Sequence, residues 1–243
     1  MADTNKIKYG LCNVYYAKIT GYALNQSTNK YEYTYATPVK FPGAVNLSLS
    51  SQASSNPFYA DNGIFTTSDT NPGYEGDLEM AKIIDSFRQD ILGEVYDSTK
   101  KQWFESSDAT RSEFALLFEF DGDVSKTRHC LYRCKATIPD IASQTKQETV
   151  DPVTETVTIT VMPRENDHEI RTRCGTDGMN YDTWYSAVNQ PDDAVQTYTQ
   201  EELEAMDITE LAELAEMWGI DTSEITTKAG LVTAILEAQA AAA

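Results

Sequence analysis

Residues 153–161, with the sequence VTETVTITV, alternate between apolar and polar side chains. A period of two is typical of a half-buried β-strand, because successive side chains of a strand point to opposite faces of the sheet. The flanking residues Pro152 and Pro163 mark the ends of the strand. One face carries Val153, Val157, Ile159 and Val161, and the other carries Thr154, Thr156, Thr158 and Thr160. The sequence therefore predicts a sheet that buries one face and presents a row of four threonines on the other.

Other segments show the same period and extend this prediction to a whole sheet. Residues 31–35 (YEYTY) place three tyrosines on one face, and residues 168–174 (HEIRTRC) alternate as well. Residues 114–120 (FALLFEF) are apolar enough for a strand that is covered on both faces. A DGD turn signal joins that strand to residues 127–138, so the two segments predict a hairpin. Residues 44–50 (AVNLSLS) carry a small polar face, consisting of Asn46, Ser48 and Ser50.

One helix interrupts the predicted strands. Residues 83–94 (IIDSFRQDILGE) place Ile84, Phe87 and Ile91 at helical spacing, and Gly93 suits the left-handed position that ends a helix. We expect this helix to lie on the sheet. The expected fold is mainly β: an antiparallel β-sandwich or partial barrel with one packed α-helix.

Two polar stretches, residues 51–63 and 66–76, are rich in Ser, Asn, Pro and Gly and are expected to be long loops. Long loops in a compact domain are usually functional or contact a partner. Their side chains form a candidate contact surface, which consists of Ser54, Asn56, Asp61, Asn62, Asp69, Asn71 and Tyr74.

The composition changes near the C-terminus. We expect a main β domain over residues 1–190, a linker over 191–200 and an all-α minidomain over 201–243. Two apolar stripes predict two short helices joined by an extended loop. The minidomain holds ten acidic residues and a single base, Lys228, which gives it a net charge of −9. The stripes consist of Leu211, Leu214, Ala215 and Trp218, and of Leu231, Val232, Ile235 and Leu236.

The charge balance argues against several functions. There are 38 acidic and 19 basic residues, a formal net charge of −19, so a basic surface that neutralises phosphates is not expected. No apolar run has the roughly 18 residues of a membrane span, and the first ten residues contain no apolar signal core. We therefore expect a protein made in a cytosol, without a membrane partner.

No catalytic or metal-binding pattern is evident in the sequence. His129, Cys130 and Cys134 lie close together, and such residues can hold zinc. On a strand, however, the two cysteines would be roughly 13 Å apart, which favours buried free thiols over a disulfide or a shared metal. Asp121 and Asp123 fit a turn better than a calcium loop, and no glycine-rich phosphate loop occurs. Residues 175–185 predict a turn and a short helix, and we expect neither enzymatic activity nor a cofactor.

Several segments in series resemble the major tail protein family of siphophages, which builds the tube of long non-contractile tails. They cover residues 7 to about 190 in the family's order. The matching segments are YGLCNVYYAKIT, ATPVKFPGAVNLSLS, NPFYADNG, GYEGDLEMAKIIDSFRQDILGE, FALLFEFDGD with TRHCLYRCKAT, TKQETVDPVTETVTITVMPR and YDTWYSAV.

This resemblance implies a structural virion protein that stacks as hexameric rings around a channel. The implied partners are other copies of the chain, the tape-measure protein, and the tail terminator and distal tail proteins. DNA would pass through the channel without specific binding, and the protein would be assembled in the host cytoplasm. Two polar strand faces become candidates for the channel wall or for a sheet continued by the neighbouring subunit: residues 154–160 with their threonines, and residues 46–50.

The C-terminal minidomain resembles the helix, extended loop, helix modules of the SAP and Rho N-terminal families, with ITELAELAEMWGI and TKAGLVTAILEA as its helices. Relatives in those families often bind nucleic acid through basic residues, whereas this segment has a single base, Lys228. An outer decoration, a partner-binding module and a solubility device all stay open for it.

Two other functions are compatible with the sequence. The tyrosines, Trp103 and Trp184 could stack on sugars in a carbohydrate or cell-surface binding β-sandwich, although large aromatic side chains more often fill a core. The second is a hydrolase whose site has no recognisable motif.

Overall fold

The computed structural model describes residues 9–25, 30–60, 62–145, 153–191, 198–218, 220–222, 225 and 227–242. The chain forms two compact units. The first, called the β unit here, comprises Met1–Thr176 and Asp182–Val188, and the second, called the C-terminal unit, comprises Asp177–Tyr181 and Asn189–Ala243.

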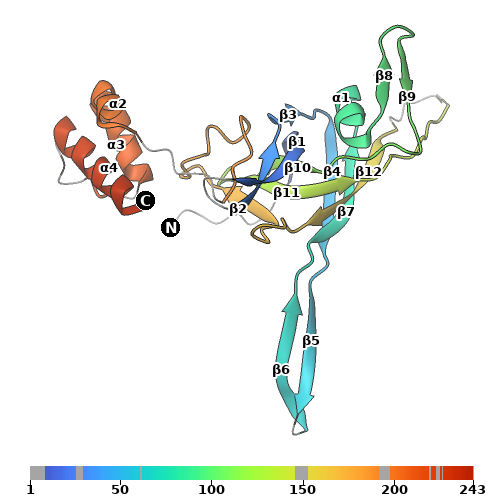
Figure 1. The fold of residues 1–243 in the computed structure, drawn as a ribbon, viewed down its shortest axis with the longest axis horizontal. Coiled ribbons are helices and arrows are strands. Elements are labelled where there is room, and N and C mark those ends of the chain that lie inside the picture. Colours follow the sequence, from blue (N-terminus) through green and yellow to red (C-terminus); the bar gives the residue numbers. More distant parts are fainter. Residues whose placement is uncertain are drawn as a thin grey trace. The chain divides into compact units, whose positions relative to one another are not determined.

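The β unit is built on one antiparallel sheet, which confirms the predicted mainly β fold (Figure 1). The strand order is β2-β1-β10-β11-β12-β7-β4, with β3 paired to β1 and β13 paired to β11. Because β2 and β4 end this path, the sheet does not close into a barrel. The strands are β1 (Leu11–Asn25), β2 (Lys30–Tyr35), β3 (Val39–Lys40), β4 (Ala44–Ser51), β7 (Tyr74–Met80), β10 (Phe114–Phe120), β11 (Arg128–Ala136), β12 (Glu155–Met162) and β13 (Arg171–Cys174).

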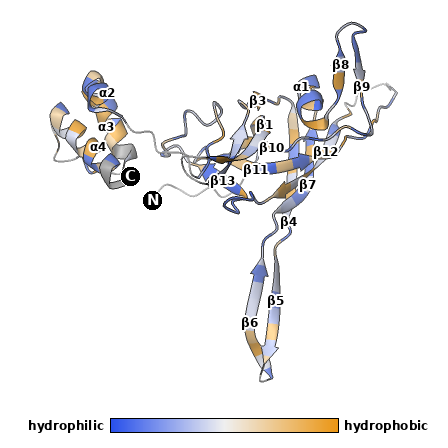
Figure 2. Cartoon of the chain, in the orientation of Figure 1, coloured by the Kyte–Doolittle hydropathy of each residue, from blue (hydrophilic) through white to orange (hydrophobic). Residues whose placement is uncertain are grey.

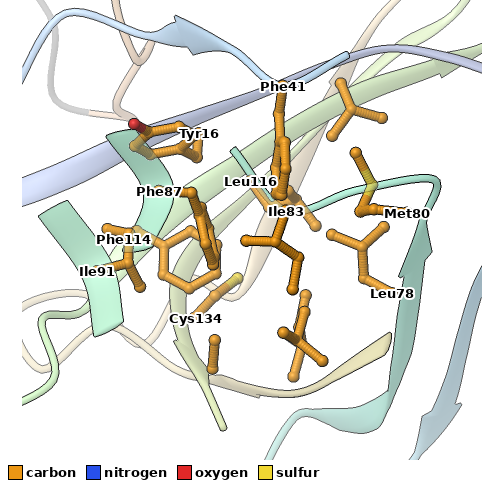
Figure 3. Packing of buried hydrophobic residues seen from close by; sticks show 14 of the residues in the cluster. Tyr16, Phe41, Leu78, Met80, Ile83, Phe87, Ile91, Phe114, Leu116 and Cys134 are labelled. Atoms are coloured by element: carbon orange, nitrogen blue, oxygen red, sulfur yellow. The ribbon is translucent and has the colours of Figure 1, made fainter. Parts of the chain in front are cut away.

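The main core lies on the face of the sheet that the predicted helix covers. Helix α1 (Asp85–Phe87) continues directly into a π-helical turn, η1 (Arg88–Leu92), which ends at Gly93 with a left-handed φ of 84°. Phe87 and Ile91 are buried against side chains of β1, β7, β10, β11 and β12 (Figure 3). Tyr16 of β1 and Leu78 of β7 belong to this same cluster, and β1 also contacts the end strand β4, so the sheet curves around the core as a partial barrel.

A second cluster covers the opposite face of β10. It contains Ala115 and Leu117 of that strand, together with Trp184, which is 3 % exposed. Residues 114–118 are all buried, as a strand covered on both faces requires. Trp184 lies in a succession of turns over residues 176–187, so the prediction of a short helix there is wrong.

A bulge in β11 changes the predicted alternation of that strand. Leu116 of β10 is paired with Leu131, and Phe114 is paired with Cys134. Between these two pairs β10 advances by two residues and β11 by three, so β11 contains one extra residue. Cys130 therefore faces the second cluster, whereas Cys134 faces the main core. All four cysteines are free thiols, and burial raises the pKa of Cys130 and Cys134.

The two predicted loops are a β-hairpin in the structure. Strands β5 (Ser54–Ala60) and β6 (Gly63–Thr70) pair with each other alone among the described residues, and they extend from the ends of β4 and β7 (Figure 1). Residues 74–76, expected in the second loop, belong to β7. A shorter hairpin is formed by β8 (Val95–Asp97) and β9 (Gln102–Phe104).

The C-terminal unit contains the two predicted helices, α3 (Ile208–Met217) and α4 (Lys228–Ala242), and an additional helix, α2 (Gln200–Ala205). Thr199 and Glu202 form a capping box at the start of α2. Both predicted apolar stripes contribute to one core, in which Leu211 and Ile235 are fully buried. Within the described residues, no helix combines the length and apolar character that crossing a membrane requires.

Candidate functional site: a polar sheet face

Strands β4, β7 and β12 lie side by side and place their polar side chains on the face opposite the main core. The pairing register of β7 with its two neighbours defines three rows across these strands. Each row has an acidic residue in the centre, a small polar residue on one side and a threonine on the other. The rows are Asn46–Glu79–Thr156, Ser48–Asp77–Thr158 and Ser50–Glu75–Thr160. We call this set, with Thr154, the polar sheet face.

The threonine row is bonded to the acidic column beside it. Thr154 donates a 2.6 Å hydrogen bond from Oγ1 to Oε1 of Glu79, and Thr158 donates one of 2.9 Å to Oδ1 of Asp77. The backbone N–H of Thr158 donates to Oγ1 of Thr137, which extends the hydroxyl-bearing surface toward β11. These bonds fix the side chains of a surface that is otherwise open to solvent.

The acidic column is closely spaced. Alternate residues of a strand are roughly 7 Å apart, so the carboxylates of Glu75, Asp77 and Glu79 form a stripe about 13 Å long. The spacing of roughly 7 Å between neighbouring acidic residues is shorter than the Debye length of about 8 Å at physiological ionic strength, so the electrostatic fields of neighbouring carboxylates overlap. Lys135, which is exposed and paired with Thr160, is the cation at the margin of this stripe. The face repels phosphates along its acidic stripe, and the residues of β4 and β12 that flank the stripe offer neutral hydroxyl and amide groups.

The structure brings together all seven residues that were predicted for a polar strand face. The acidic column between them was missed, because residues 66–76 were interpreted as a loop and β7 was not recognised. A signal for it exists: in YEGDLEM (74–80) the acids alternate with Gly76, Leu78 and Met80. Gly76 allows close approach of β4, since a Cβ atom there would lie 1.9 Å from the carbonyl oxygen of Ser48.

Strand β4 forms one end of the sheet and carries one margin of the polar sheet face. Among the described residues it is paired only with β7. Its other edge therefore presents backbone N–H and C=O groups that can pair with another strand.

The β5–β6 hairpin carries the other predicted site residues. Ser54, Asn56 and Asp69 lie on its strands and Asn62 lies in its turn, while Asp61 is outside the described residues. Asn71 follows the hairpin, and Tyr74 begins β7, where the guanidinium of Arg171 lies 5.6 Å from its ring centroid. The structure thus separates these residues between the hairpin and its base.

The end of this hairpin is apolar, which the sequence reasoning did not identify. Four large side chains there are between 62 and 70 % exposed. They form what we call the hairpin tip: Phe58, Tyr59, Ile64 and Phe65. Figure 2 shows hydrophobic residues near this end of the hairpin. Apart from Pro57, Ala60 and Gly63, the rest of the two strands carries hydroxyl and other polar side chains. Exposed apolar clusters on a projecting element are typical of protein–protein contacts.

The two tryptophans suggested for sugar binding do not form a common surface, whereas four of the tyrosines contact one another on β1 and β2: Tyr22, Tyr31, Tyr33 and Tyr35. Trp184 is buried in the second cluster, and Trp103 packs against Tyr96 on the β8–β9 hairpin with a centroid distance of 4.9 Å. A cavity of about 210 Å³ does open between β4, β7, β10, β11 and β13, but leucine and phenylalanine side chains dominate its lining. Typical small-molecule sites have volumes of about 300–1,000 Å³.

One histidine packs against an aromatic ring, and the other lies in a turn. His129 stacks on Phe118 at a centroid distance of 5.2 Å, and His168 lies in the turn between β12 and β13 with a φ of 62°. The described part of the chain contains no group of three or more His, Cys, Asp or Glu side chains arranged to hold a metal ion. No protein-family model matches the chain, and no curated protein matches its sequence.

Proposed function

We propose that the protein is the structural subunit of a tube, in which copies form rings and the rings stack around a channel. The resemblance implies six copies in each ring. The polar sheet face would line the channel of a long non-contractile phage tail. The observation that carries this proposal is the polar sheet face itself: a broad, ordered surface with an acidic stripe and no basic cluster.

A conduit for DNA needs the opposite of a binding surface. Proteins bind DNA by neutralising phosphates with Lys and Arg, and affinity grows with each neutralised phosphate. Glu75, Asp77 and Glu79 repel phosphates, while the flanking Ser and Thr hydroxyls carry no charge that would hold them. DNA, and the tape-measure protein before it, could therefore slide along this wall.

The unpaired edge of β4 supports contact between neighbouring copies. An open edge next to a broad sheet face is an aggregation hazard in a monomer. If a strand of the next copy in a ring covers this edge, the hazard is removed and the polar sheet face continues from one copy to the next. Head-to-tail contacts of this kind close into a ring when the rotation permits.

The β5–β6 hairpin supports contact between rings. An isolated two-stranded hairpin is marginally stable in water, and each side chain of the hairpin tip is more than 60 % exposed. A neighbouring copy that buries Phe58 and Phe65 would stabilise the hairpin and hold the two copies together. The tail terminator and distal tail proteins would make the equivalent contacts at the two ends of the tube.

The purified full-length protein tests this proposal. Size exclusion with light scattering and negative-stain electron microscopy should reveal rings or striated tubes whose formation depends on protein concentration. A monomer that persists at high concentration would contradict the proposal. Retention of that monomer on a glycan column would favour a carbohydrate-binding function in its place.

A further inference from the structure

The C-terminal unit contains a groove between helices α2 and α4. The groove has a volume of about 800 Å³. Val232 and Leu236 form its apolar floor, and Glu204 and Glu237 lie at its margins. The remaining lining residues are Gln200, Lys228, Ala229 and Thr233.

The outward face of α4 is unusual for a helix in solvent. A surface helix normally has a charged face opposite its apolar stripe. Over its 15 residues, α4 carries only Lys228 at its start and Glu237 near its end. Ala229 and Thr233 are exposed between these two charges on the side that faces the groove, so the middle of this side lacks the charges expected of a fully solvated helix.

One hydrogen bond joins the two walls of the groove, and a second lies along the α2 wall. Nζ of Lys228 donates a 2.6 Å hydrogen bond to the backbone carbonyl of Glu204, at the C-terminal end of α2. Gln200 donates from Nε2 to Oε1 of Glu204 at 2.8 Å, on the groove side of the same helix. The first turn of α4 is thus tied to the last turn of α2, so the groove exists before any partner binds.

The charge of this segment decides which partner fits. Residues 201–243 have a net charge of −9, so a second copy of the unit, an acidic peptide or a nucleic acid would be repelled. A cationic partner would be attracted by Glu204 and Glu237 beside the apolar floor. The floor requires apolar side chains on that partner as well.

We propose that this groove binds a cationic amphipathic helix of a partner protein. From Ala229 to Glu237, α4 rises about 12 Å, which matches roughly two turns of a bound helix. The partner helix would place apolar side chains at positions i, i+3 or i+4, and i+7 on Val232 and Leu236, with Lys or Arg beside the two glutamates. This inference concerns the C-terminal unit and holds whether or not the β unit forms tubes.

Titration of the full-length protein with a defined probe tests the inference. The probe is the peptide LKKLLKLLKKLLKL, and the control is a peptide of the same composition whose leucines follow no helical stripe. We expect the amphipathic peptide to bind at least 10-fold more tightly by isothermal titration calorimetry. Equal binding of the two peptides would overturn the inference, because it would reflect net charge alone.

Two variants locate the binding site. Thr233→Trp fills the groove without changing the charge, and Ala229→Lys places a cation in it; each should weaken binding at least 10-fold. The matched control, Thr209→Trp, lies on the exposed start of α3 and should bind as the wild type does. Circular dichroism confirms that each variant is folded. Wild-type affinity in folded Ala229→Lys would overturn the inference even if Thr233→Trp fails to fold.

Discussion

The hydroxyl of Thr158 donates a 2.9 Å hydrogen bond to Oδ1 of Asp77 across the boundary between β12 and β7. The bond joins the threonine row to the acidic column and makes them one surface. Because the surface is solvent-accessible, these bonds contribute little to stability: each exchanges with water and is worth about 1 kcal/mol. The stability of the fold therefore depends little on the bonds of the polar sheet face, which is the reason to assign this face a function.

Replacing the bonded threonines with valine separates stability from function. Thr154→Val and Thr158→Val keep the β-branched shape that suits a strand. We expect the double variant to lose less than about 2 kcal/mol of unfolding free energy, measured by urea denaturation. A loss above that range would mean that the polar sheet face is a structural network.

Gly76 is predicted to be indispensable to the same surface. A Cβ atom at this position would lie 1.9 Å from the carbonyl oxygen of Ser48, so Gly76→Ala must push β4 away from β7. We expect the unfolding free energy, measured by urea denaturation, to fall by about 1–3 kcal/mol. Gly63→Ala is the matched control, since a Cβ atom there meets nothing within 4 Å. Equal stability of the two variants would contradict the close approach of β4 and β7.

A buried ion pair makes the β unit sensitive to acid. The side chain of Arg164 is 1 % exposed, lies 4.8 Å from the ring centroid of Tyr132 and bonds to both carboxylate oxygens of Asp167. Burial opposes the charge of Asp167, but hydrogen bonds from Arg164 and from the backbone of Glu169 outweigh it and lower the pKa of Asp167 below its usual 3.8. The stabilisation is therefore complete above pH 3.8 and is lost as the pH falls through the lower, folded-state pKa.

Asp167→Asn should remove this stabilisation and leave the buried Arg164 without its counter-charge. We expect a loss of about 3 kcal/mol at neutral pH, with a smaller further loss on acidification than in the wild type. Urea denaturation at several pH values checks both effects. Asp182→Asn, at an exposed position of the same unit, is the control and should leave stability unchanged. If the two variants behave alike, Arg164 does not depend on Asp167.

The hairpin tip is predicted to serve assembly and not the stability of the monomer. Phe58 and Phe65 are 62 and 70 % exposed, so changing both to Ser removes little buried area. We expect Phe58→Ser/Phe65→Ser to keep the thermal midpoint of the monomer and to lose tube formation in electron microscopy. Thr67→Ala, on the polar part of the hairpin, should assemble normally. Normal tubes from the double variant would contradict the role proposed for the tip.

Much of the fold follows from local sequence periods, and its departures have physical causes. Alternation predicted β12 and β4, and the spacing of Phe87 and Ile91 predicted the helix on the core. The β5–β6 hairpin was missed because both of its faces are exposed, so it has no apolar alternation. The bulge in β11 inverts the faces of Cys134 and Ala136, and a period of two cannot reveal an inserted residue.

The candidate site was predicted in part for a related reason. Each polar strand face could be recognised by itself, but the sequence does not state which strands are neighbours. Strand β7 lies between β4 and β12 and supplies the acids. Gly73, which precedes the strand, and Gly76 within it made its first half resemble a loop. Only the pairing register places Asp77 beside both Ser48 and Thr158.

The accessibility of Thr160→Cys in assembled protein tests the central claim most directly. The background carries Cys12→Ser and Cys174→Ser, since the buried Cys130 and Cys134 have raised pKa values and react slowly. If the polar sheet face lines a channel, N-ethylmaleimide labels this cysteine in both monomer and tube, whereas a maleimide bearing a long polyethylene glycol chain labels only the monomer. Full labelling of the tube by the long reagent would place the face on the outside and contradict the account.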